Sequence, residues 1–204
     1  MRHHPTPAPV RYFVAFTVTA FALFVLLFWA FGMRQIADED NLMENMQAVV
    51  ILFSIAVFVT QALRVGSTQR LTLWAAAWLS LSFLLRELDI EDTPGMPALL
   101  VDLGSGSGRN WMLAGGWLLI LVLTLIHVYR ARPVLMNLVQ TWLRSPAFLL
   151  MVSAATLLVL GEFFEKGLSH WWANAFFEEL SEFSGDCCMA MAGLLSGERA
   201  RGSR

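Results

Sequence analysis

Three acidic residues follow one another at intervals of four near the start of the last apolar segment: Glu178, Glu182 and Asp186. On a helix this spacing places their side chains in one stripe, and Asp186 lies about 12 Å further along the axis than Glu178. Charged groups inside a membrane-spanning helix are costly and usually face a cavity, a partner or an ion. Like charges in a row also repel, so we expect a metal cation, an Arg or Lys side chain, or protonation to offset them. Alternatively, the span begins later and the acids lie among lipid headgroups.

A second polar group follows the fifth apolar segment, in the sequence GEFFEKGLSH. Glu162 and Glu165 are three residues apart and share one face of a helix, and His170 follows in a short loop. We assign Glu165, His170 and Glu182 as the candidate general acids or bases. A simpler interpretation covers part of this group, because Glu162 and Lys166 are four residues apart and would form an ordinary surface ion pair.

Further charged residues occur where other apolar segments begin or end. Arg86 directly follows 15 uncharged residues, and we expect it to pair with a carboxylate of the fifth or sixth span. Glu44, with Asn45 and Gln47, lies at the start of the second span. An acidic first turn is ordinary helix chemistry for the preceding Asp38 to Asp40, but this alternative is weaker for Glu44, which lies further into the helix. Arg109 follows the glycine-rich segment LGSGSG and would hold a lipid phosphate, unless that segment is simply a flexible loop. The residues assigned to charge pairing or substrate binding are Arg86, Glu87, Asp89, Glu44 and Arg109.

The composition indicates that a membrane positions these groups. The chain has 204 residues, of which 57% are hydrophobic and only 15% charged, whereas about a quarter of a soluble domain is charged. The apolar residues gather in segments that approach the length of about 20 residues needed to cross a bilayer. We predict an all-α polytopic integral membrane protein, a six-transmembrane-helix bundle in a single membrane domain over residues 1–204. The predicted spans are residues 12–33, 45–63, 71–88, 110–129, 145–165 and 176–197.

The basic residues predict the orientation of these spans. With six spans, ten of the 14 Lys and Arg residues lie on the side that holds both termini, so both termini are predicted to be cytoplasmic. Of the 16 Asp and Glu residues, all but Glu198 lie on or near the opposite side. After Pro133, Leu135, Leu138 and Trp142 recur at helical spacing, which predicts a short amphipathic helix in the cytoplasmic interface. Because arginine replaces lysine almost throughout, we expect the inner (plasma) membrane of a bacterium.

With this topology the polar groups share the exoplasmic leaflet, and we expect them to converge on one pocket open to the exoplasmic (periplasmic) side. A pocket rich in carboxylates and without thiolates favours Mg²⁺, Ca²⁺ or Mn²⁺, and one histidine beside carboxylates also suits Zn²⁺. Cys187 and Cys188 are adjacent, so we expect no disulfide between them and treat both as packing residues. The residues assigned as metal ligands are Glu178, Glu179, Glu182, Asp186 and Glu162.

Three functions are compatible with such a pocket. The first is an enzyme that acts on a lipid or lipid-linked substrate, with a divalent metal as a candidate cofactor. The second is a non-catalytic membrane subunit or assembly factor, working as a homo- or hetero-oligomer. The third is a cation- or proton-coupled transporter, although the apolar and small residues from Cys187 to Gly197 would close its path at the cytoplasmic end. The net charge of -2 gives no basis for nucleic-acid binding.

Overall fold

The computed structural model describes residues 8–30, 42–87, 106–166 and 173–202. The described residues are helical and contain no strand, as the sequence predicts. The helices are α1 (Ala8–Ala30), α2 (Leu42–Arg64), α3 (Ser67–Glu87), α5 (Gly106–Leu143), α6 (Pro146–Glu165) and α7 (Asn174–Gly202). Each of the six predicted spans overlaps one of these helices within the described residues.

Four segments of the described chain are long and apolar enough to cross a membrane: α1, α2, the Gly108–Tyr129 part of α5, and α6. They support a multi-pass membrane protein in contact with lipid. The other two helices are less apolar for a physical reason. In α3, charges at Arg70 and Arg86 bracket only 15 uncharged residues, and α7 carries several acids in its first half. The number of six crossings and their orientation stay predictions.

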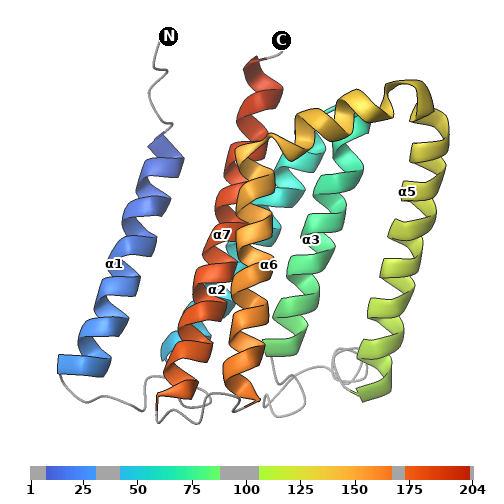
Figure 1. The fold of residues 1–204 in the computed structure, drawn as a ribbon. Helices are drawn as coiled ribbons and strands as arrows, with labels where there is room; N and C mark the ends of the chain where they lie inside the picture. The colour runs from blue at the N-terminus through green and yellow to red at the C-terminus, as the bar shows by residue number, and fades with distance from the viewer. Residues whose placement is uncertain (1–7, 31–41, 88–105, 167–172, 203–204) are drawn as a thin grey trace. The chain divides into compact units, whose positions relative to one another are not determined.

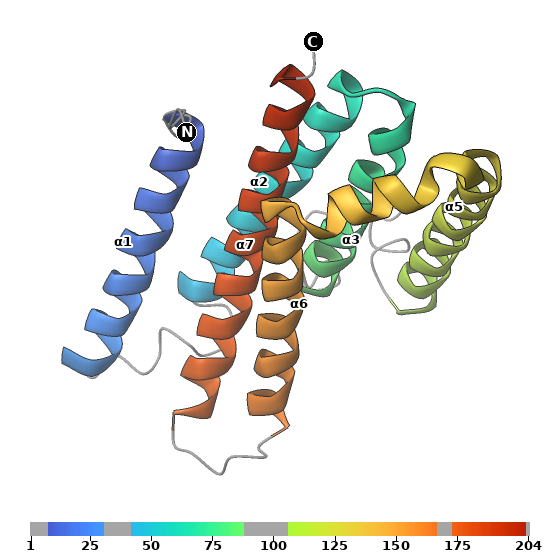
Figure 2. The same cartoon turned by 45° about the horizontal axis from the view of Figure 1, so that its top comes forward.

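The chain divides into two compact units, Met1–Val50 with Pro146–Arg204, and Ile51–Ser145. The first unit contains α1, the first turns of α2, α6 and α7. In both views α7 runs antiparallel to α6 and lies between α6 and α1 (Figures 1 and 2). The first residues of α1 and the last residues of α7 lie at the same end of this unit (Figure 1). The prediction of a single domain is not tested by this division and stays a prediction.

Small residues bring α6 and α7 close together. A Cβ atom on Gly185 of α7 would lie 3.3 Å from the backbone oxygen of Ala154 and 3.1 Å from Cγ of Leu158, both on α6. A Cβ atom on Gly161 of α6 would lie 2.8 Å from Cγ of Glu182 on α7. Helices in lipid associate through such close packing because lipid tails provide no hydrophobic driving force between them. The α6–α7 pair is therefore the main helix contact of this unit.

Aromatic side chains join α1 to the opposite side of α7. The rings of Phe28 and Phe176 are stacked with their centroids 3.9 Å apart. Phe24 meets Phe183 edge to face, with centroids 5.2 Å apart, and Phe24 and Phe183 are both fully buried. These rings form the core of the unit together with Met43 of α2. Aromatic packing on one side and small residues on the other leave α7 largely enclosed.

The second unit is built around the pair α3 and α5, which run antiparallel. The indole ring of Trp78 lies directly against the backbone of Gly116, where any side chain would collide with it. Nη1 of Arg109 donates a hydrogen bond of 3.2 Å to the backbone oxygen of Leu85, near the end of α3. Arg109 and Gly116 are seven residues apart, as are Trp78 and Leu85, so one antiparallel register explains both contacts.

Helix α5 has 38 residues, about 57 Å if it were straight, which exceeds a hydrocarbon core of about 30 Å. It contains both the predicted fourth span and the short helix predicted after Pro133. The sequence predicted a separate short helix after Pro133, but the backbone stays helical through this residue, and α5 changes direction in its C-terminal part (Figures 1 and 2). A proline removes one backbone hydrogen bond and bends a helix without having to end it. The interfacial position of this part stays a prediction.

Candidate functional site

The acids of α7 are buried, although they are charged residues in an apolar protein. Glu182 is 5% exposed and Asp186 is 3% exposed, and the neighbouring Ser181 is also buried. Glu178 and Glu179, one turn nearer the start of α7, are half-buried. Since each residue advances a helix by 1.5 Å, Glu182 and Asp186 lie about 12 and 18 Å from the start of α7. Neighbouring helices therefore enclose Glu182 and Asp186. The alternative in which the span begins later and the acids lie at the level of the headgroups concerns their depth in the membrane and stays open.

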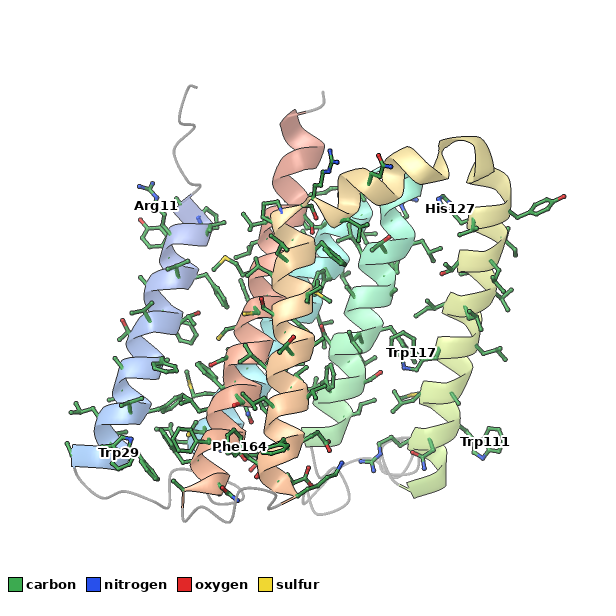
Figure 3. All side chains as sticks on the ribbon, in the orientation of Figure 1. Arg11, Trp29, Trp111, Trp117, His127 and Phe164 are labelled. Atoms are coloured by element: carbon green, nitrogen blue, oxygen red, sulfur yellow. The ribbon has the colours of Figure 1, made fainter. Side chains whose placement is uncertain are left out.

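Aromatic residues lie at the end of the first unit where α7 begins. Figure 3 shows Trp29 and Phe164 at the same end of the unit, with Arg11 at the opposite end of α1. Phe164, near the end of α6, is 5.7 Å from Phe177 in the first turn of α7, measured between ring centroids. Aromatic residues concentrate where a membrane meets water. The acids therefore begin close to an aromatic end and continue inward.

Three of the acids share a narrower face than the sequence spacing suggests. With about 100° of rotation per residue, Glu179, Glu182 and Asp186 fall within about 60°, whereas the predicted stripe of Glu178, Glu182 and Asp186 covers about 80°. We call the first set the carboxylate face. Among the described residues of this unit, α6 lies beside this face through Gly161 next to Glu182, and α2 reaches the same turn of α7 through a hydrogen bond to the backbone oxygen of Glu179.

Gly161 lets the side chain of Glu182 lie against the backbone of α6. A Cβ atom at position 161 would come 3.3 Å from Oε1 of Glu182, in addition to its clash with Cγ. Any other residue here would displace the carboxylate. Sequence reasoning did not single out Gly161, although a glycine between the apolar residues of a span is a recognised sign of close helix packing.

Gln47 joins α2 to the carboxylate face. Its Nε2 donates a hydrogen bond of 3.2 Å to the backbone oxygen of Glu179. The Gln47 side chain is only 1% exposed, and its Oε1 is buried without a hydrogen-bond partner in the described structure. Buried polar atoms are rarely left in this state, because each one loses its bonds to water. Gln47 therefore brings an acceptor oxygen that still needs a donor.

The remaining predicted residues are placed elsewhere. Glu162 and Lys166 form the simple ion pair, with 3.0 Å between Oε2 and Nζ, and both are exposed. The pKa of Lys166 is raised by its hydrogen bond with Glu162 and by the negative charge of that carboxylate. Glu165 is exposed at the end of α6, and Glu44 is half-buried in the first turn of α2. None of these three carboxylates belongs to the carboxylate face.

Several predicted groups lie outside the described residues. These are His170 and Asp89, together with the side chains of Arg86 and Glu87 at the end of α3. Arg109 lies in the second unit, where one of its nitrogens is bonded to the backbone of α3. Its assignment to a substrate stays a prediction, as do the catalytic assignments of His170, Glu165 and Glu182.

The metal assignment gains no support from the described residues. Among them, no group of three or more His, Cys, Asp or Glu side chains is placed to hold a metal ion. A ligand set completed by a residue outside the described ranges stays a prediction. Cys187 and Cys188 are free thiols, buried and half-buried respectively, as expected for packing residues.

Comparison with known proteins identifies no relative. No protein-family model, no curated protein and no solved structure matches this chain. The functional argument therefore depends on the geometry of the carboxylate face.

Proposed function

We propose that this is a multi-pass protein of the bacterial inner membrane whose carboxylate face binds a lipid or lipid-linked substrate from the exoplasmic leaflet. The observation that carries this proposal is the burial of Glu182 and Asp186 on α7. Removing an ion from water costs several kcal/mol even after the protein relaxes. Ionisable residues at membrane depth are therefore expected to serve a function.

The distribution of polar residues along α7 favours a binding site over a conduit. The acids occupy the first half of the helix, whereas Cys187 to Leu195 are apolar or small. A path for ions across the membrane would need polar groups in both halves. A site that is polar at one end only suits a ligand that enters and leaves from the same leaflet, which is the way a lipid headgroup would reach it.

The chemistry available to such a site is that of carboxyl groups. They accept hydrogen bonds from a positively charged or hydroxyl-bearing headgroup, and they exchange protons with a bound substrate as general acid or base. A divalent metal would add Lewis-acid chemistry, but the binding proposal does not require one.

Lipid analysis of the purified full chain tests this proposal. We expect Glu182→Gln and Asp186→Asn to reduce the amount of one lipid class that copurifies with the wild-type protein. Glu165→Gln is the matched control, because Glu165 is an exposed carboxylate at the end of α6 and its loss should leave the bound lipid unchanged. An identical lipid profile in all four proteins would overturn the proposal.

A second candidate function is a non-catalytic membrane subunit, and one observation favours it. No residue of Gly108–Tyr129 on α5 is buried in this structure, so the side of this helix part that does not contact α3 is available to lipid or to a helix of another protein. A photoreactive residue at Leu119 would distinguish these neighbours in native membranes. Crosslinks to one protein of defined mass favour the subunit, and crosslinks to lipid alone contradict it.

A further inference from the structure

We propose that the carboxylate face binds a protonated primary amine, with Oε1 of Gln47 as one of its hydrogen-bond acceptors. This inference rests on the proposed function, because it names the chemical class of ligand for the same site. It depends on a different observation, however, namely the buried acceptor of α2 rather than the burial of the acids.

The position of Gln47 is fixed by one hydrogen bond. Nε2 donates to the backbone oxygen of Glu179 over 3.2 Å, which holds the amide group against α7 at the level where the carboxylate face begins. Oε1 is bonded to the same carbon atom as Nε2, so it lies beside the same turn of α7. Gln47 is almost fully buried, and Oε1 meets no donor in the described structure. A ligand at this place must therefore offer a hydrogen-bond donor.

An ammonium group fits this requirement better than the other cations. It carries three N–H donors, so it can bond to the Gln47 oxygen and to carboxylate oxygens at the same time. A divalent metal would prefer a larger set of oxygen ligands, and the described residues contain no group of three acidic, histidine or cysteine ligands. A trimethylammonium group has the same charge but no N–H, and it would leave Oε1 without a donor. Hydrogen-bond donation, rather than charge alone, is thus the recognised property.

Two sources would supply this group: the headgroup of an aminoethyl phospholipid, or a small amine dissolved in water. Both present the same N–H donors to Gln47. The lipid would reach the site within its own leaflet, whereas the soluble amine would enter from the aromatic end of the unit near Trp29 and Phe164 (Figure 3).

The test compares two lipids that differ only in the methylation of the amine. The full chain is placed in bilayers with equal amounts of phosphatidylethanolamine and phosphatidylcholine, and the lipids retained after detergent extraction are measured by mass spectrometry. We expect about a tenfold preference for the primary amine, the usual effect of one hydrogen bond to a charged group. In a second arm, ethylammonium is added to lipid-free micelles. A rise in Tm there, absent with tetramethylammonium, would support the amine site and assign it to a soluble ligand.

Substitutions at two glutamines of α2 connect the result to Gln47. Gln47→Met removes the acceptor at nearly constant volume and should abolish the headgroup preference. Gln61→Met makes the same change later in α2, at a half-buried position, and should preserve it. Equal retention of both lipids by the wild type, with no response to ethylammonium, would overturn the inference. Both of these measurements use only the wild-type protein, so they test the inference even if Gln47→Met does not fold.

The two proposals fail in different ways. If Glu182→Gln loses a bound lipid but the wild type does not distinguish primary from quaternary amines, the carboxylate face is a lipid site and the amine inference is wrong. If neither Glu182→Gln nor Asp186→Asn changes the lipids that the protein retains, the proposed function itself is wrong.

Discussion

Helix α7 and the Gly108–Tyr129 part of α5 together show the reverse of the burial pattern of a soluble protein. The α5 segment is one of the four most apolar segments of the described chain, and none of its residues is buried. Helix α7 carries Glu182 and Asp186, and both are buried between neighbouring helices. In water the apolar helix would be the enclosed one. In a bilayer, apolar side chains face lipid at no cost, and the polar side chains are the ones that must be enclosed.

The contrast also separates two roles within one chain. The α5 segment has the surface of an anchor, with leucines exposed over much of its circumference and only the side of Gly116 packed against α3. On α7 the residue types change around the helix axis, from small residues facing α6, through carboxylates, to aromatic contacts with α1. We therefore expect the functional site on α7, whose faces carry different residue types, and not on the apolar α5 segment.

The largest effect is expected from a charge placed on the α5 segment. Leu119 lies near its middle and is 58% exposed. If this surface faces lipid, Leu119→Asp should destabilise the inserted protein by about 3 kcal/mol, the cost of an aspartate at the centre of a spanning helix. The amount of full-length protein in the membrane fraction measures this. Leu143→Asp, at the exposed end of the same helix, should have little effect. Equal yields of both variants would show that the α5 segment does not face lipid.

A smaller effect is expected from adding one methyl group at each of two glycines. Gly161→Ala places a Cβ atom 2.8 Å from Cγ of Glu182 and should destabilise the protein by about 2 kcal/mol through overpacking. Gly115→Ala on α5 meets nothing within 4 Å and should be neutral or slightly stabilising, because alanine favours helix. Thermal unfolding of the two variants checks this opposite behaviour. A neutral Gly161→Ala would mean that α6 and α7 are less closely packed than described.

The smallest effect is expected at the exposed ion pair of Glu162 and Lys166. Its attraction raises the pKa of Lys166 above the ordinary value of 10.5. Because the folded pKa exceeds the unfolded one, any stabilisation is present at neutral pH and is lost as the pH rises through the raised pKa. Both side chains are exposed, so salt screens the pair. We therefore expect no measurable change in Tm for Lys166→Gln at pH 7 in physiological salt, and a clear decrease would contradict this account.

The helices were predictable from the sequence because apolar length alone identifies them. Residues 45–63 and 145–165 correspond closely to α2 and α6. The prediction was less accurate at Pro133, where the sequence predicted a separate short helix but α5 continues without a break. Helix α3, with only 15 uncharged residues between its arginines, shows why counting crossings from composition is harder than finding helices.

The site was predictable only in part. The spacing of the acids identified α7 as the helix of interest and included Glu182 and Asp186. The interval of four favoured Glu178 as the third member of a face, although a rotation of about 100° per residue already places Glu179 nearer to Glu182 and Asp186 around the helix axis. The roles of Gly161 and Gln47 likewise depend on neighbours that are distant in sequence. The contact of Arg109 could not be predicted either, because its hydrogen bond to the backbone of α3 depends on the register of two packed helices.

Chemical modification of the carboxylates in native membranes tests the central claim most directly, namely that the carboxylate face of α7 is enclosed. A water-soluble carbodiimide with an amine nucleophile labels carboxyl groups that water reaches, and mass spectrometry of peptides gives the labelling rate at each position. The account predicts that Glu165 is labelled rapidly, while Glu182 and Asp186 are labelled only after the protein is unfolded in detergent. Labelling of Glu182 and Asp186 at the rate of Glu165 in the folded protein would contradict it.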